Sequence, residues 1–118
     1  MESQNESKWL WPAALDALIA SPQHHKLLFE NDKVRVIDAC ILPGEITEVH
    51  THKWPASLYI LSWSDFVRYD SNGIILDSRD LNLSLLLSAA AWSEPLTPHA
   101  LKNTGTKDLH IISVEIKA

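Results

Sequence analysis

The sequence predicts an all-β fold with one short helix near its N-terminus. From residue 26 onward, short runs of β-branched, aromatic and leucine residues are separated by glycine, proline, asparagine and aspartate, which is the pattern of strands and turns. Only one segment has the apolar spacing of a helix. Many short strands with a single helix favour a β-sandwich or barrel. At 118 residues, the chain has the size of one domain.

The helix is expected at residues 12–20. Pro12 suits a first helical turn, because the N–H that proline lacks would have no partner there. The leucines that follow fall on one helical face, and Ser21-Pro22 ends the segment. We therefore assign residues 1–25 to a tail and short helix, and residues 26–118 to the β-barrel.

The strands are expected between the turn signals that follow the helix. Asn72-Gly73 is typical of a two-residue hairpin, because such turns need a positive φ at their central residues. The run from Leu58 to Leu61 is apolar on both faces, so a second sheet has to cover one face and the helix or another subunit the other. The expected strands are Lys26–Glu30, Val34–Leu42, Glu48–Lys53, Ser57–Trp63, Phe66–Asp70, Ile74–Asp77, Leu83–Leu87, Ala100–Asn103 and Leu109–Ile116.

Charge and composition narrow the classes of partner. Ten lysines and arginines against fifteen acidic residues give a net charge of −5 without a basic cluster, so neither nucleic acid nor an anionic membrane is expected as a partner. The first seven residues are polar and acidic, unlike a signal peptide, and a cytoplasmic location is expected. Five tryptophans and the strand that is apolar on both faces predict a homodimer.

Metal chemistry in this chain has to rest on imidazole. Cys40 is the only cysteine, so neither an internal disulfide nor a thiolate cluster is possible. His50 and His52 lie two residues apart, and this spacing places both on one face of a strand. His99 follows Pro98 at the start of another strand, from which it can point across a barrel. Three neutral imidazoles suit one divalent transition metal ion, which could be iron, zinc, nickel, manganese or copper. The remaining histidines, expected to be structural, are His24, His25 and His110.

With these residues the chain resembles a small single-domain member of the cupin superfamily. Gly44, His50 and His52 match the opening Gly-x5-His-x-His of the first cupin motif. His99 and Asn103 match the His-x3-Asn that ends the second motif. The resemblance implies an RmlC-like jelly-roll barrel, the cupin double-stranded β-helix, with a metal ion inside it.

One ligand that the resemblance implies is missing. The first cupin motif continues to a glutamate three or four residues after its second histidine, where this chain has Pro55 and Ala56. The remaining three-histidine site resembles those of thiol dioxygenases and of a β-diketone-cleaving dioxygenase, in which Fe(II) binds substrate and O2 together. Glu48 and Glu94 are the acidic residues that could complete the metal sphere from other positions.

Further residues are candidates for the wall of a substrate cavity. Trp54 comes two residues after His52, and we expect it to shape the cavity together with Tyr59 and Arg68. Ser57 is a candidate for the same wall. Asn103, and again Ser57, are expected to orient a ligand histidine through its other ring nitrogen.

Three functions fit the sequence. The first is a metal-dependent enzyme of dioxygenase-like type, or an isomerase or lyase, which acts on a small organic molecule in the barrel. The second is a non-catalytic cupin that binds a small molecule as a sensor or binding module, and the absent glutamate slightly favours it over the first. The third is a metal-free structural dimer.

Overall fold

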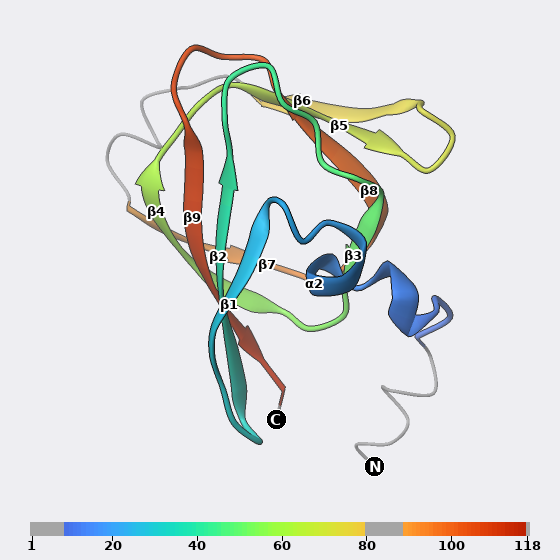
Figure 1. Ribbon diagram of the computed structural model, residues 1–118, viewed down its shortest axis with the longest axis vertical. Coiled ribbons are helices and arrows are strands. Elements are labelled where there is room, and N and C mark those ends of the chain that lie inside the picture. Colours follow the sequence, from blue (N-terminus) through green and yellow to red (C-terminus); the bar gives the residue numbers. More distant parts are fainter. Residues whose placement is uncertain (1–8, 80–88, 118) are drawn as a thin grey trace.

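The computed structural model describes residues 9–79 and 89–117. The chain folds into two antiparallel sheets that face each other, with two short helical segments on one side (Figure 1). This confirms the mostly β class with a short N-terminal helix. The helical segments are η1 (Ala13–Leu15) and α2 (Ala17–Ala20). The strands are β1 (His25–Glu30), β2 (Val34–Ile41), β3 (His50–His52), β4 (Ala56–Ser62), β5 (Phe66–Asp70), β6 (Ile75–Arg79), β7 (Ala90–Ser93), β8 (Leu96–Asn103) and β9 (Leu109–Ile116).

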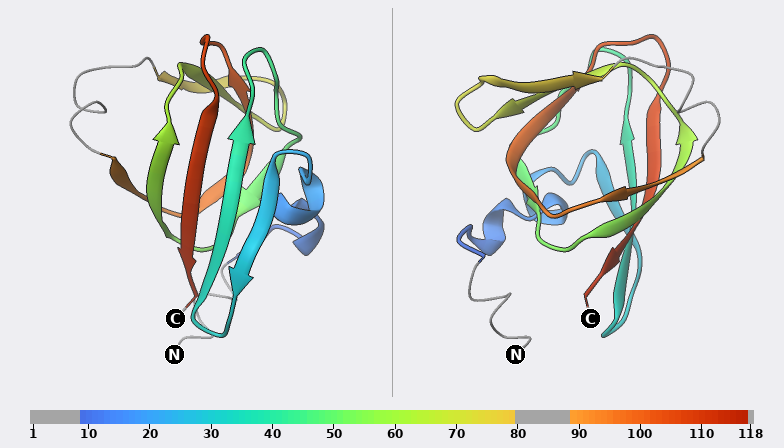
Figure 2. Two further views of the ribbon diagram at one scale, coloured as in Figure 1. Left: turned by 60° about the vertical axis from the view of Figure 1, so that its left-hand side comes forward. Right: turned by 180° about the vertical axis from the view of Figure 1, so that it is seen from behind.

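The two sheets interleave strands from both halves of the chain. Five strands form one sheet in the order β1-β2-β9-β4-β7, and four form the other in the order β3-β8-β5-β6. Strands far apart in the sequence therefore lie side by side, as Figure 2 shows for β2 and β9. Ile41, Phe66 and Leu109 form a buried apolar cluster between the sheets. This cluster fixes the spacing across which side chains from the two sheets meet.

Most of the observed strands coincide with, or overlap, the strands expected from the sequence. Phe66–Asp70 and Leu109–Ile116 have the expected bounds, whereas β7 was not expected. The strand expected at Leu83–Leu87 lies outside the described residues. β8 begins before the expected Ala100 and so contains Pro98. The sheet tolerates this proline because the β3–β8 register is irregular at this point.

The helix expected at residues 12–20 is interrupted at Asp16. This residue has an extended backbone, with φ −54° and ψ 141°, and it forms an isolated parallel bridge with Thr51 next to the barrel. Its carboxylate accepts a hydrogen bond from the backbone N–H of Leu18 at 3.1 Å. The helix therefore starts anew after Asp16, because an aspartate favours the cap over the helix interior. In the described part of the chain, no helix is long and apolar enough to span a membrane.

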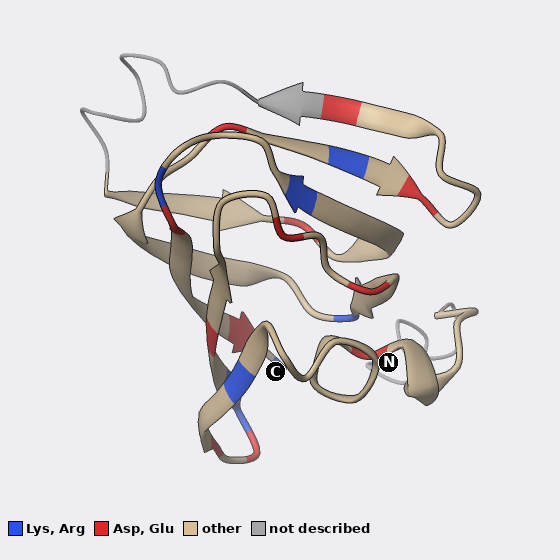
Figure 3. Ribbon diagram, turned by 45° about the horizontal axis from the view of Figure 1, so that its top comes forward, with Lys and Arg blue, Asp and Glu red and all other residues tan. Residues whose placement is uncertain are grey.

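The two faces of β4 have different environments. Leu58 and Ile60 point into the barrel, whereas Tyr59 and Leu61 are 54% and 52% exposed on the outer face of the five-stranded sheet. The helix does not cover this outer face, since α2 packs against β1 and β3. Acidic and basic positions are interspersed along the described chain (Figure 3). A hairpin joins β5 and β6 as predicted, but its turn is not the expected two-residue one. Gly73 has a φ of +83° whereas Asn72 has no positive φ, and the N–H of Gly73 donates to the carbonyl oxygen of Asp70 at 3.0 Å, so Ser71 and Asn72 are the central residues of the turn.

Candidate metal centre

A cavity of about 270 Å³ lies between the two sheets. It falls just below the usual size range of sites for drug-sized ligands, so it fits a smaller molecule. Its wall is mostly apolar, because the inward positions of β2, β4 and β9 carry alanine, leucine and isoleucine. The largest group of polar side chains in the wall is made up of the histidines, which lie together.

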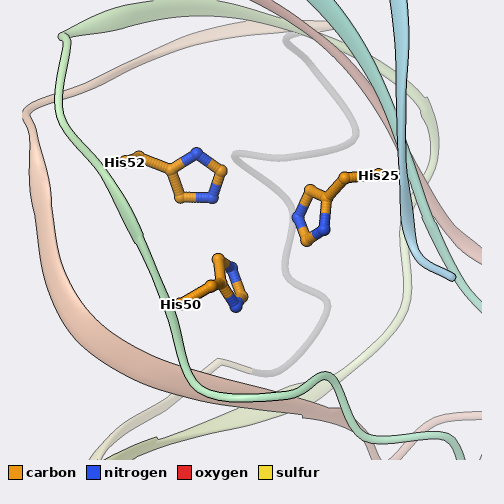
Figure 4. A group of neighbouring side chains, drawn as sticks. All are labelled: His25, His50 and His52. Atoms are coloured by element: carbon orange, nitrogen blue, oxygen red, sulfur yellow. The ribbon is translucent and has the colours of Figure 1, made fainter. Parts of the chain in front are cut away.

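Four imidazoles meet in the cavity, and we refer to them as the imidazole cluster. β3 places His50 and His52 on adjacent inward positions of its bent backbone, β1 contributes His25, and β8 contributes His99. The ring centroid of His50 lies 4.7 Å from that of His25, 5.0 Å from that of His52 and 4.5 Å from that of His99. Figure 4 shows the rings of His25, His50 and His52 turned toward one another from opposite sides of the barrel.

Three members of the cluster are close enough to share one ion. One ring nitrogen from each of His25, His50 and His52 lies within 4.8 Å of the other two. His99 lies next to this group, with its ring 5.9 Å from that of His52. The structure therefore contains a three-histidine group that could hold a metal ion, with a fourth imidazole beside it.

Each imidazole of the cluster is oriented through its Nδ1 atom. The Nδ1 atoms of His25, His50 and His99 lie 3.0, 2.7 and 2.8 Å from backbone carbonyl oxygens. The Nδ1 atom of His52 lies 3.0 Å from Oε2 of Glu115. Carbonyl and carboxylate oxygens only accept hydrogen bonds, so Nδ1 is the protonated nitrogen in each ring. In the neutral form of each ring, Nε2 therefore keeps its lone pair, as a metal ligand requires.

The environment keeps the buried imidazoles neutral. Burial, followed by the nearby His52, lowers the pKa of His50 to about 2 and that of His25 to about 4. Burial also lowers the pKa of His99 to about 4. A neutral ring binds a metal without first losing a proton. The donor set is therefore ready for a divalent transition metal ion at neutral pH, and its chemistry fits the ions that imidazole prefers.

Glu115 is an acidic residue of the site that was not expected from the sequence. Its carboxylate is 0% exposed, and Oε1 lies 2.8 Å from Nε of Arg35 while Oε2 meets His52. The signal was the alternation in β9, where Glu115 has the same parity as the inward-facing Leu109 and Ser113. Of the two glutamates considered as ligands, Glu48 is exposed, and exposed Glu94 accepts a hydrogen bond from Trp92 Nε1. Neither carboxylate is bonded to the cluster, although the backbone carbonyl oxygen of Glu48 lies 2.7 Å from Nδ1 of His50.

The structure changes the expected roles of the histidines. His50, His52 and His99 do come together, as expected, but His25 is a member of the cluster and not a structural bystander. It was missed because β1 starts one residue earlier than expected, so its first side chain points into the barrel. The other two histidines contact acidic residues: Nε2 of His24 lies 3.4 Å from Oε1 of Glu45, and Nε2 of His110 lies 2.9 Å from Oδ1 of Asp38.

Only part of the expected cavity wall is found. Trp54 and Arg68 line the cavity. Ser57 and Tyr59 do not, because they occupy the outward positions of β4. Asn103 does not orient a histidine: its Nδ2 donates to the carbonyl oxygens of Ile41 and Lys107 at 2.8 and 2.7 Å. It stabilises the turn after β8 instead.

No protein-family model and no curated protein matches this sequence. Solved structures do resemble it. A cupin domain from Bordetella pertussis Tohama I is 16% identical, with 80% of this chain and 92% of that chain covered and a TM-score of 0.59. An uncharacterized double-stranded β-helix protein from Klebsiella pneumoniae is 18% identical, with 79% and 75% covered and a TM-score of 0.54. An RmlC-like cupin from Methanocaldococcus jannaschii is 12% identical, with 78% and 77% covered and a TM-score of 0.53.

At these identities the likeness concerns the fold. The chain has the double-stranded β-helix fold of RmlC-like cupins. Within that fold it carries the three-histidine group His25, His50 and His52.

The lowered pKa values predict that acid destabilises the metal-free protein. The ordinary pKa of histidine is 6.5, against about 4 for His25 and His99 in the folded chain. Between these values the unfolded chain binds more protons than the folded chain, so stability rises with pH. We expect the free energy of unfolding, measured with urea on chelator-treated protein, to be maximal above pH 6.5 and to fall toward pH 4. The variant His25→Gln should reduce this fall, and an equal fall in the variant would contradict the assignment.

Proposed function

We propose that this chain is a metal-dependent cupin that binds one divalent transition metal ion at the imidazole cluster and acts on a small, mostly apolar organic molecule in the adjoining cavity. One observation carries the proposal: all four imidazoles have Nδ1 bonded to an oxygen acceptor, which leaves every Nε2 free to bind. His25, His50 and His52 are the residues proposed to hold the ion, and His99 is the fourth donor within reach. When bound, such an ion supplies Lewis acidity, and iron or copper also supplies redox chemistry with O2.

The cavity wall supports a role for the metal and not for acid–base side chains alone. In the described part of that wall, the ionisable side chains outside the cluster are Glu115 and Arg68. Glu115 is held by Arg35 and His52, and Arg68 donates to both carboxylate oxygens of Asp77 at 2.9 and 2.7 Å. Among the described ionisable side chains of the wall, none outside the imidazole cluster is thus a free general acid or base. The dioxygenase-like reaction is therefore the enzyme type that we propose.

Two donors suggest what the molecule in the cavity carries. The indole N–H of Trp63, a residue of the wall, is buried without a hydrogen-bond partner among the described residues. Arg68 lies close enough to His99 to lower its pKa, after the larger effect of burial. An oxygen acceptor on a bound molecule would satisfy the indole N–H, whose burial is otherwise unfavourable, and a negative charge would be attracted to Arg68. We therefore propose an apolar compound with a ketone, enolate or carboxylate group.

Metal uptake tests the proposal directly. Chelator-treated protein should take up one equivalent of Co(II), Zn(II) or Fe(II), with absorption bands of a nitrogen-ligated ion in the Co(II) form. His50→Ala and His52→Ala should each weaken metal affinity by more than the roughly 10- to 100-fold that loss of an outer partner causes.

His110→Ala is the matched control, because this histidine lies outside the cavity and should leave affinity unchanged. Comparison of His25→Ala with His99→Ala identifies the third ligand. Failure of the wild-type protein to take up any of these ions at neutral pH would contradict the proposed function.

Oxygen consumption separates an enzyme from a binding module. Protein loaded with Fe(II) without oxygen, then mixed with O2 and a β-diketone, a thiol or a small organic acid, should consume O2 with at least one class of compound. The variant Trp63→Phe keeps an aromatic ring of smaller size and removes the N–H donor, so it should raise KM for that compound. Tight binding of a test compound without turnover would instead assign the non-catalytic function to this chain.

We also propose that the chain forms a homodimer through the outer face of the five-stranded sheet. Tyr59 and Leu61 are exposed there, and Tyr59 lies opposite Ile112 of β9. On the same face Nε2 of His110 lies 2.9 Å from Oδ1 of Asp38, so this carboxylate has a hydrogen-bond partner within the chain, and a two-fold pairing of the face would place the apolar side chains of both copies together.

Light scattering tests the dimer. We expect a mass of about twice the 13.3 kDa of the chain, and Leu61→Lys should give a monomer. Ile74→Lys, at an exposed position outside the outer face, should leave the dimer intact. A wild-type monomer would rule out this interface.

A further inference from the structure

A continuous chain of polar contacts joins the N-terminal segment to the imidazole cluster. Nη2 and Nη1 of Arg35 donate to the two carboxylate oxygens of Asp16 at 2.8 and 3.0 Å. Nε of the same side chain donates to Oε1 of Glu115 at 2.8 Å, and Oε2 of Glu115 accepts from Nδ1 of His52 at 3.0 Å. We call Asp16, Arg35, Glu115 and His52 the relay. It passes from the residue before α2, through β2 and β9, to the candidate ligand in β3.

The burial of the relay makes each contact depend on the next. Arg35 is 6% exposed and Glu115 is fully buried. A buried carboxylate needs its charge and its lone pairs satisfied, and here Arg35 supplies the cation while His52 supplies the second donor. Without Arg35, the carboxylate of Glu115 would lose the partner that fixes its rotamer. The ring of His52, which depends on that carboxylate for its orientation, would then be free to turn.

Arg35 is held on several sides. It lies opposite Glu115 in the β2–β9 register, and its guanidinium carbon lies 5.0 Å from the centroid of the Trp54 ring. Burial lowers the pKa of Arg35, but the hydrogen bonds and charges of Asp16 and Glu115 outweigh it and leave the pKa above its ordinary value. The geometry uses three nitrogens in a planar fork, which lysine does not have.

We propose that Arg35 and Asp16 are positioning residues of the metal centre, which act on His52 through Glu115. This inference rests on the proposed function, because it assigns His52 a role as a metal ligand. It adds that the N-terminal segment, through Asp16, sets the orientation of His52. By reciprocity, a ligand that orders His52 also strengthens the contact of this segment with the barrel.

The first test needs no metal. Nitrogen NMR of the imidazoles in the metal-free protein reports which nitrogen of His52 carries the proton. We expect His52 to be protonated at Nδ1 in the wild-type protein, and Arg35→Lys to give a mixture of the two tautomers. Arg68→Lys is the matched control: it alters the other cavity arginine, which is bonded to Asp77, and should leave the His52 tautomer unchanged. An unchanged tautomer in folded Arg35→Lys would overturn the proposal.

The second test measures Zn(II) affinity in a double-mutant cycle. Arg35→Lys should weaken affinity by about 10- to 100-fold, the usual effect of losing an outer partner of a metal ligand. Asp16→Asn retains an oxygen that can cap Leu18 but loses the charge, and should weaken affinity less. Asp16→Asn leaves the backbone bridge to Thr51 in place and removes only the charge that Arg35 contacts, so it should have no further effect in the Arg35→Lys background.

The outcomes separate this inference from the proposed function. If Arg35→Lys lowers the thermal midpoint but leaves Zn(II) affinity unchanged, the role of Arg35 is only structural and the proposal is wrong. If Asp16→Asn weakens affinity equally in both backgrounds, the route through Arg35 is wrong. A wild-type protein that takes up none of Co(II), Zn(II) and Fe(II) but shows the expected tautomers would overturn the proposed function and leave the orientation of His52 by the relay supported.

Discussion

The buried carboxylate of Glu115 is the group on which the site depends most. It belongs to the centre of the five-stranded sheet, where β9 lies between β2 and β4, yet one of its oxygens bonds to His52 in the other sheet. A carboxylate in this position is stable only with a cation and a second donor. Arg35 and His52 meet those two needs at once. The same contacts that make the buried charge tolerable therefore also set the direction of a candidate metal ligand.

Backbone carbonyl oxygens orient most of the rings in the imidazole cluster. Three of its four rings donate to carbonyl oxygens, and for His50 and His99 the acceptor lies two residues earlier in the chain. The backbone just before each of these two histidines therefore sets the orientation of its ring, at the start of β3 for His50 and in the irregular part of β8 for His99. Only His52 requires a partner that is distant in sequence.

The fold was largely predictable from the sequence, and the site only in part. Turn signals and runs of β-formers gave β5 and β9 at their true bounds, and the spacing of His50 and His52 placed them on one strand face. Two residues of the site were not predicted from the sequence, because their roles depend on where the fold places them. His25 points inward only because β1 starts at that residue, and Glu115 becomes part of the site only through the pairing of β9 with β2. Ser57 and Tyr59 were assigned to the cavity because a strand that is apolar on both faces does not reveal which face is inside.

The placement of His25 has a mechanical consequence. His25 lies in β1 of the five-stranded sheet, whereas His50 and His52 lie in β3 of the four-stranded sheet. An ion shared by these three rings would fasten the two sheets to each other at the open end of the barrel, much as a disulfide fastens two segments in an oxidised protein. Because such an ion binds the folded chain and finds no assembled site in the unfolded one, its free energy of binding adds to the free energy of unfolding. Heat resistance would then rise with the concentration of free metal.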